Sequence, residues 1–329
     1  MKESKLFALL PDYVATPDSM AIDSEGNLIL SCPNFANPTL PGCVLKIDKD
    51  RNITKWFDVP VREDTGMARP MGIGFGPDGD LYLIDNQPWL EKPELIRKGR
   101  LLRLRIEGNT VVKCTVVANN MEHPNGLRIR NGYVYLTQSK MELVEDPSGK
   151  LVSCVYRFGL DEENIQITNT LADPHILCTF LTQNPKDQYG VDGIEFDREG
   201  NLLIGNFGDG AVYKVTFNED GSVKSDEVWA QDPEELESTD GMIMDEDGNL
   251  YIADFCANAI VKVSPDGKTV RRLAQSPDCT GLEGGLDQPG EPIIWNNRII
   301  AACFDTVVND IVRNTAHELP ATLAEIELD

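Results

Sequence analysis

The chain has 329 residues and a formal net charge of −24 at pH 7, from 54 acidic and 30 basic side chains. This charge disfavours nucleic acid and anionic membranes as partners, because few basic side chains are present to replace the counterions of phosphates, and it favours cations. No segment approaches the ~18 consecutive apolar residues of a membrane span, and the N-terminal apolar run is too short for a signal peptide, so we expect a soluble, cytoplasmic protein.

One short sequence pattern recurs along the chain. Four copies are complete and end in Gly-Asn-Leu or Gly-Asp-Leu, and two further copies are degenerate. In chain order the copies begin at Asp18, Met71, Asn125, Asp192, Asp240 and Glu291. They follow one another at intervals of roughly 50 to 70 residues, which is the length of one four-stranded propeller blade with its loops.

Each copy predicts a β-hairpin followed by two more strands. In the fifth copy, alternating apolar residues flank the turn Asp245-Glu-Asp-Gly248, whose glycine suits a positive φ. The segments 259–263 and 269–274 then alternate in the same way and predict a third and a fourth strand. The repeating unit is therefore expected to be a sheet of four short strands.

We accordingly predict an all-β protein, a six-bladed β-propeller with four-stranded antiparallel blades. No linker rich in Ser, Gly or Pro interrupts the repeat, so residues 1–329 are expected to form a single domain. The longest departures from the repeat are insertions at 87–99 and 141–150. Such insertions form the walls of a binding mouth or plain surface loops.

The first residues of the six copies are expected to form a ring around one mouth of the central channel. In a propeller, the innermost strand of every blade begins at the same mouth. The ring would hold three Asp, one Asn and one Glu, and carboxylates that converge in this way stay ionised together when a cation lies among them. Oxygen ligands without Cys or His favour calcium, while magnesium, manganese and zinc remain open. The alternative is that each Asp-Gly pair only begins a turn.

The repeat resembles the senescence-marker-protein/gluconolactonase family and the related squid-type diisopropylfluorophosphatase and paraoxonase. The segments His123-Pro-Asn-Gly-Leu and 239–254 carry the resemblance most clearly. It implies a six-bladed propeller whose divalent ion is held by residues that here are Asp18, Asn125, Asp192 and Asp240. Asp18 is one methylene shorter than the family's usual Glu, and Asp192 replaces an Asn.

A second ring is expected where the second strand of each blade returns to the same mouth. Its members would be Cys32, Asp85, Gln138, Asn206, Asp254 and Cys303. Asp254 lies behind Asp240 in one blade and could take part in catalysis or only support a ligand. Cys32 and Cys303 have acids rather than bases nearby in the sequence, so inert thiols are the better interpretation. The eight cysteines contain no CxxC pair, which excludes zinc-ribbon and thioredoxin-type sites.

A divalent ion with open positions predicts hydrolysis of a small-molecule lactone. The ion would polarise the carbonyl oxygen, and Asp192, Asp254 or Glu291 would take the proton from water or attack directly. Asp240 joins these candidate catalytic residues because activity is expected to depend on its charge. The sequence lacks a Gly-x-Ser-x-Gly elbow, a phosphate-binding loop and a dinucleotide fingerprint.

Two other functions remain open at this stage. The same metal site could hydrolyse phosphotriesters or aryl esters, which apolar wall residues such as Met71, Trp89 and Phe255 would favour. The chain could also be a non-catalytic binding module with a structural ion, in which case the mouth should be covered. The sequence leaves the oligomeric state open.

Overall fold

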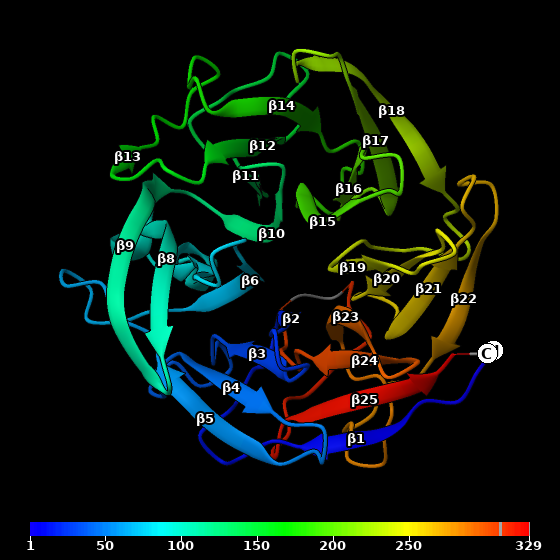
Figure 1. Ribbon diagram of the computed structural model, residues 1–329. Helices are drawn as coiled ribbons and strands as arrows, with labels where there is room; N and C mark the ends of the chain where they lie inside the picture. Colours follow the sequence, from blue (N-terminus) through cyan, green and yellow to red (C-terminus); the bar gives the residue numbers. More distant parts are fainter. Residues whose placement is uncertain (309–310, 329) are drawn as a thin grey trace.

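The computed structural model describes residues 1–308 and 311–328, and it arranges six antiparallel sheets in a ring (Figure 1). This confirms the predicted six-bladed β-propeller. Blade one holds β2 (Met20–Ile22), β3 (Leu28–Cys32), β4 (Cys43–Ile47) and β5 (Ile53–Asp58). Blade two holds β6 (Pro70–Phe75), β7 (Leu81–Asp85), β8 (Gly99–Glu107) and β9 (Thr110–Met121), with β13 (Ile165–Gln166) added in parallel at its edge.

The remaining blades follow the same order from the channel outward. Blade three holds β10 (Pro124–Arg130), β11 (Tyr133–Gln138), β12 (Val152–Gly159) and β14 (Ile176–Leu181). Blade four holds β15 (Val191–Phe196), β16 (Leu202–Asn206), β17 (Ala211–Phe217) and β18 (Val223–Gln231). Blade five holds β19 (Met242–Met244), β20 (Leu250–Asp254), β21 (Ala259–Val263) and β22 (Val270–Gln275). Among the described residues, no helix is long and apolar enough to cross a membrane.

Blade six closes the ring with strands from both ends of the chain. It holds β23 (Pro289–Trp295), β24 (Arg298–Cys303) and β25 (Thr322–Glu327), and β1 (Lys5–Leu9) pairs with β25 as its outermost strand. Apolar side chains of β1 and β23, among them Phe7 and Trp295, pack in one buried cluster with those of blade one. The N-terminal strand is therefore joined to the last blade by backbone pairing, and a shared apolar core joins blades one and six.

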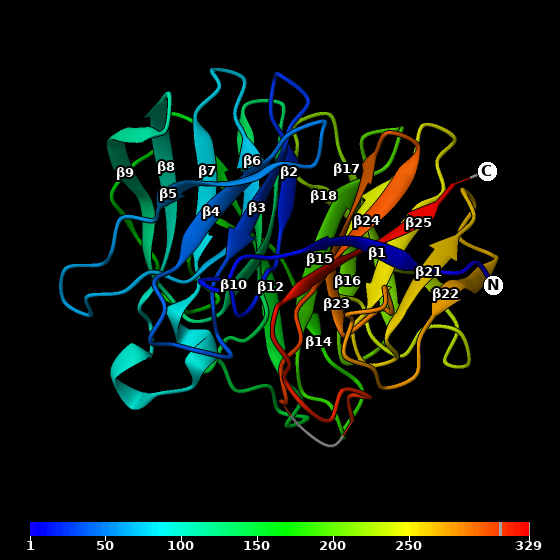
Figure 2. The ribbon, with the colours of Figure 1, turned by 90° about the horizontal axis from the view of Figure 1, so that it is seen from below.

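The insertion after β7 forms two short 3-10 helices, η1 (Gln87–Leu90) and η2 (Pro93–Leu95). Figure 2 shows this segment and the long β24–β25 connection at the same end of the ring, below the strands. That end is where the innermost strands begin and the second strands finish. The loops that could cover the predicted site thus gather at its mouth.

A β-bulge recurs near the start of the innermost strands and fixes which residues face one another around the channel. The pairing shifts register between Pro70 and Ile73 and between Pro124 and Leu127. In the same way it shifts between Val191 and Ile194 and between Pro289 and Pro292. The residue that follows the first bulge residue is the ring position.

This register corrects one sequence prediction. In blade six the residue after Pro289 is Gly290, so Gly290 holds the ring position and Glu291 lies one residue further along β23. Glu291 occupies the position that Gly126 and Gly193 have in blades three and four. A shift of one residue carries its side chain deeper into the channel.

The glycines after the ring residues are needed because neighbouring blades touch there. A Cβ added to Gly126 would lie 2.5 Å from the carbonyl oxygen of Asp192, and one added to Gly193 would lie 2.1 Å from that of Asp240. These contacts are backbone contacts, which cannot yield as a flexible side chain can. The Asp-Gly and Asn-Gly pairs therefore allow close blade packing rather than a turn, and this packing brings the ring residues together.

Candidate metal centre and active site

The four residues expected as metal ligands lie together at the channel mouth where the innermost strands begin. Asp18, Asn125 and Asp192 are buried, and Asp240 is partly exposed. The Asn125 Nδ2 donates to Asp192 Oδ2 at 2.6 Å and to the Tyr189 hydroxyl at 3.2 Å. The ring is thus assembled from blades one, three, four and five, as the resemblance implies.

Burial and mutual repulsion act on the three carboxyl groups of this ring. Burial, followed by the charge of Glu291, raises the pKa of Asp18 well above its ordinary value. Burial and the charges of Asp18 and Glu291 do the same to the pKa of Asp192. Burial and the charge of Asp192 raise the pKa of Asp240. The site therefore stabilises either protons or a cation among these groups.

The donor set fits a hard divalent ion. Among the described residues, no Lys, Arg or His forms an ion pair with Asp18, Asp192 or Asp240, so their charge is not balanced by a side chain. In the described chain, an acidic cluster elsewhere has one ligand atom of each residue within 4.8 Å of the others. The three carboxylates of the ring do not lie this close together. An ion would draw them closer. The amide of Asn125 can present Oδ1 in place of Nδ2 by rotating about its last side-chain bond.

These pKa shifts predict how the stability of the metal-free protein depends on pH. Each folded pKa lies above that of the unfolded chain, so the folded state holds more protons than the unfolded state from about pH 4 upward. The free energy of unfolding should then fall as pH rises through this window. We expect metal-stripped protein to melt at a higher temperature at pH 5 than at pH 8, and added Ca²⁺ to remove most of that difference.

Thermal melts of stripped and Ca²⁺-loaded protein at the two pH values test this expectation. The control is Asp192→Asn, which removes one of the coupled carboxyl groups and should make the pH dependence of the stripped protein shallower. A stripped wild-type protein whose melting temperature rises from pH 5 to pH 8 would contradict the expectation.

Glu291 lies near the predicted ligands but pairs with the partly exposed Arg128. The Arg128 Nη2 lies 3.1 Å from Glu291 Oε1, and the Arg128 Nε lies 3.1 Å from Glu195 Oε2. The Ser19 hydroxyl donates to Glu291 Oε2 at 3.4 Å. Burial raises the pKa of Glu291, and the charge of Arg128 opposes this shift. Because each carboxylate oxygen of Glu291 already has a hydrogen-bond partner, Glu291 is not placed to act as a free base.

Asp254 is at the end of β20, as the second ring requires, but it binds backbone. Its carboxylate accepts the Glu237 N–H at 2.8 Å, and the N–H and hydroxyl of Ser238 each at 2.9 Å. Burial raises the pKa of Asp254 to about 6, and the hydrogen bonds from Glu237 and Ser238 oppose the shift. Asp254 thus fixes the loop that leads to Asp240. Among the described residues, it forms no hydrogen bond with Asp18, Asn125, Asp192 or Asp240.

Other members of the second ring do the same in their blades. Asp85 accepts the Arg69 N–H, and Gln138 accepts the Glu122 N–H. The expected ring itself is confirmed, since β3, β7, β11, β16, β20 and β24 end at Cys32, Asp85, Gln138, Asn206, Asp254 and Cys303. Burial raises the pKa of both Cys32 and Cys303, which leaves these thiols protonated.

An aromatic collar surrounds the ring, and of its members only Trp89 and Phe255 were expected from the sequence, as apolar wall residues. It consists of the aromatic side chains that follow the second strands, together with Tyr189: Phe35, Trp89, Tyr189, Phe207, Phe255 and Phe304. Successive members touch, from the Phe35–Trp89 stack at 4.2 Å to the Phe207–Phe255 edge contact at 5.6 Å. The collar reaches the ring itself, because the Tyr189 hydroxyl bonds Asn125.

His123 lies beside this collar in a neutral form. Its ring meets Tyr189 edge-on at 6.0 Å, and its Nδ1 is buried without a hydrogen-bond partner in the described chain. Burial, with a smaller effect of Lys140, lowers the pKa of His123 to about 3. A neutral imidazole here can pack or accept a hydrogen bond, but it carries no charge for substrate binding.

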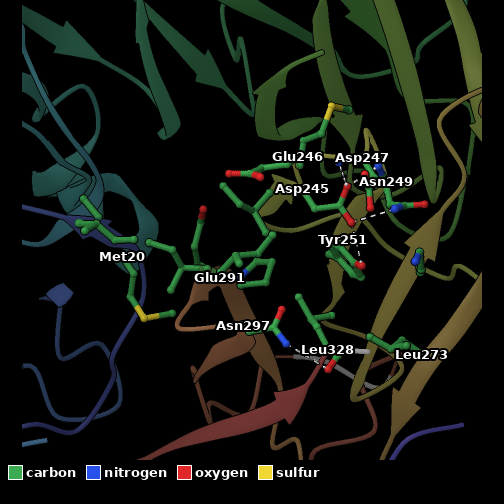
Figure 3. A pocket seen from close by; sticks show the side chains of 18 of the residues that line it. Met20, Asp245, Glu246, Asp247, Asn249, Tyr251, Leu273, Glu291, Asn297 and Leu328 are labelled. Atoms are coloured by element: carbon green, nitrogen blue, oxygen red, sulfur yellow. Dashed lines mark hydrogen bonds between the residues drawn. The ribbon is translucent and has the colours of Figure 1, made fainter. Parts of the chain in front are cut away.

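The opposite mouth of the channel, where the hairpin turns lie, leads into a cavity. This cavity of about 1180 Å³ extends from the mouth to the level of Arg128 and Glu291. Figure 3 shows Glu291 and the Asp245–Asp247 turn on different sides of this cavity. The pair of Arg128 and Glu291 therefore stands between the cavity and the carboxylate ring.

Comparisons with known proteins agree with the resemblance and the fold. Residues 130–281 match the family model described as "SMP-30/Gluconolactonase/LRE-like region", a segment that includes Asp192 and Asp240. A search of curated proteins gave no significant match. The relation to diisopropylfluorophosphatase and paraoxonase stays a prediction.

Solved structures share the architecture at low sequence identity. A gluconolactonase from Xanthomonas campestris superposes with a TM-score of 0.63 at 14% identity, covering 100% of this chain and 96% of its own. A calcium-binding regucalcin from Agrobacterium tumefaciens gives a TM-score of 0.61 at 11% identity over 100% and 96% of the two chains. A PQQ-bound aldose sugar dehydrogenase from Streptomyces coelicolor gives a TM-score of 0.61 at 15% identity over 99% and 98%. At these identities the structures establish the fold alone.

Proposed function

We propose, from the premise that residues 130–281 belong to the SMP-30/gluconolactonase-like family, that the protein is a metal-dependent hydrolase of a small-molecule lactone. The divalent ion of this proposal is calcium, and its ligands are Asp18, Asn125, Asp192 and Asp240. The observation that carries the proposal is the cluster formed by the buried Asp18 and Asp192 and the partly exposed Asp240, whose pKa values are strongly raised and which have no cationic side chain paired to them in the described chain. A protein tolerates such a group where a cation or a proton is part of its function.

When bound, a divalent ion supplies a Lewis acid that polarises the lactone carbonyl oxygen and stabilises the charge developing on it. The side chains do the remaining work. Asp240 is the ring carboxyl group that solvent reaches, so it accepts the proton of the attacking water, and the charge of Asp192 beside it raises its affinity for that proton. Tyr189 holds Asn125 in place through the hydrogen bond to its hydroxyl.

A second candidate is the hydrolysis of aryl esters at the same ring. It is favoured by the aromatic collar, because Trp89 is partly exposed while it packs against the buried Phe304, so its ring can contact an apolar group. A lactone with an apolar substituent would use the same surface. The collar thus favours apolar acyl or aryl parts over bare sugar rings.

A substrate panel tests the proposal. Sugar lactones, alkyl lactones, aryl esters and a phosphotriester should be compared at saturating Ca²⁺, and again after the metal has been removed. We expect lactone hydrolysis to dominate and to disappear on metal removal. Turnover of no member of the panel, with a tightly bound ion present, would overturn the proposal and favour a binding module.

The position of Glu291 predicts a mild catalytic effect for Glu291→Gln. Arg128 would lose one charged partner but keep Glu195 and the carbonyl of Met242, so we expect a destabilisation of about 1–3 kcal/mol. The kcat at saturating metal should stay within about threefold of wild type. Urea denaturation and steady-state kinetics measure the two effects. A fall in kcat of about 10²–10⁴ with unchanged metal affinity would instead identify Glu291 as the general base.

A further inference from the structure

A second acidic cluster lies in the loops of blade six, outside the carboxylate ring. Asp287 precedes β23, Asp305 follows β24, and Glu318 precedes β25. One carboxylate oxygen from each of the three lies within 4.8 Å of the other two. Among the described residues, no other group of three acidic, His or Cys side chains is this closely spaced. Three separate chain segments therefore meet at one point.

The Asp287 carboxylate forms no hydrogen bond with any of the described residues. Its side chain is 1% exposed, and both of its carboxylate oxygens are buried without a hydrogen-bond partner in the described part of the chain. Glu318 Oε2 and Asn314 Oδ1 are buried and unpartnered in the same way. A buried carboxylate that makes no hydrogen bond is costly, so native proteins retain one where something else binds it.

Asp305 is held rigidly toward this point. Its Oδ2 accepts the Glu318 N–H at 2.9 Å and lies 3.0 Å from His317 Nδ1, and its Oδ1 accepts Asn314 Nδ2 at 3.0 Å. Three neighbouring donors fix the carboxylate, while both oxygens of Asp287 and the Oε2 of Glu318 have no hydrogen-bond partner among the described residues. The arrangement has the oriented oxygen donors and supporting hydrogen bonds of a metal site.

We propose that Asp287, Asp305 and Glu318 bind a second divalent cation, with the amide oxygen of Asn314 as a further ligand. The donors are all oxygen, which suits a hard ion of the calcium type. The ion ties the segment before β23 to both ends of the long β24–β25 connection. Its role is to fasten the blade in which β1 and β25 close the propeller.

This second site shares no residue with the carboxylate ring. The ring takes its ligands from blades one, three, four and five, and the second site takes all of its ligands from blade six. Loss of one site should therefore leave the other able to bind. The two can be separated by substitution, whether or not the ring proves to be catalytic.

Calcium titration of metal-stripped protein by calorimetry tests the proposal with matched variants. Asp287→Asn and Glu318→Gln each remove one charge from the cluster and keep the size of the side chain. Glu283→Gln removes an exposed carboxylate from the same loop as Asp287 and serves as the control. Asp240→Asn reports on the ring independently.

We expect Asp287→Asn and Glu318→Gln each to bind one Ca²⁺ fewer than wild type, while Glu283→Gln binds the wild-type number. The melting temperatures should cross over. Without calcium, Asp287→Asn should melt at or above the wild-type temperature, because repulsion is relieved. At a Ca²⁺ concentration about 100 times the dissociation constant, wild type should melt roughly 4 °C higher than the variant.

Two outcomes would overturn the proposal. The first is an unchanged calcium stoichiometry in both Asp287→Asn and Glu318→Gln. The second is a calcium-induced rise in melting temperature that is the same in wild type and in both variants. A loss of binding seen only in Asp240→Asn would locate all bound calcium in the ring and would count as the first outcome.

Discussion

Asparagine in place of Asp240 is expected to lower kcat/KM by about 10²–10⁴-fold, the range typical of a lost general base. The substitution keeps the shape of the side chain. It removes one charge from the cluster of three carboxyl groups that Asp240 forms with Asp18 and Asp192. The hydrogen bond from the Gly241 N–H to Oδ1 can be kept by an amide oxygen. Steady-state kinetics at saturating Ca²⁺ measure the effect, and circular dichroism checks the fold.

Asp247→Asn provides the matched control for this prediction. Asp247 is exposed in the hairpin turn of the same blade, so its loss changes the net charge equally but leaves the ring untouched. Its kinetics should equal those of wild type. If Asp240→Asn also kept wild-type kcat at saturating metal, Asp240 would play no part in the chemistry, and Asp192 would be the carboxylate to test next.

Alanine at Gly193 should destabilise the protein by about 1–3 kcal/mol or more, because the new Cβ would lie 2.1 Å from the carbonyl oxygen of Asp240. Blades four and five would have to separate at the level of the ring. The same movement would widen the distance between Asp192 and Asp240, so calcium affinity should fall with stability. Urea denaturation and calcium titration measure both effects.

Gly74→Ala is the appropriate comparison. Gly74 also lies in an innermost strand, but the nearest atom to an added Cβ is a side-chain methyl carbon of Leu127, 2.9 Å away, which can move. Its effect should therefore be the smaller of the two. Equal stability of the Gly193 and Gly74 variants would contradict the close blade contact described for the ring.

The repeat was sufficient to predict the architecture because a similar hairpin recurs in every blade, at intervals that match the length of one blade. The ends of the second strands were predicted in all blades for the same reason, Cys32 and Asp254 among them. The role of these residues was not predicted, since a sequence pattern does not show which backbone N–H groups a buried carboxylate will meet. The sequence therefore left open whether Asp254 takes part in catalysis or only supports a ligand.

The misplacement of Glu291 has a physical cause and a signal that was available. A bulge adds one residue at the start of the innermost strand, which alternation alone does not reveal. The signal is the preceding proline, because Pro70 and Pro124 stand directly before Met71 and Asn125. By the same rule Pro289 places Gly290 in the ring and Glu291 one step beyond it.

Most of the aromatic collar and the second acidic cluster were harder to foresee, although Trp89 and Phe255 were expected as apolar wall residues. Collar members such as Phe35 and Phe255 follow the second strands at slightly different distances, so they share a position in space without sharing one in the repeat. Asp287, Asp305 and Glu318 belong to loops that have no counterpart in other blades. Only the closure of blade six brings such residues together.

The most direct test of the central claim is the number of ions bound per chain by wild type and by the double variant Asp18→Asn/Asp240→Asn, measured by elemental analysis after equilibration with Ca²⁺. Our interpretation predicts that the double variant binds one ion fewer than wild type and has no lactonase activity, while it still unfolds in one cooperative transition. An equal number of ions in the two proteins would contradict a metal centre at the carboxylate ring.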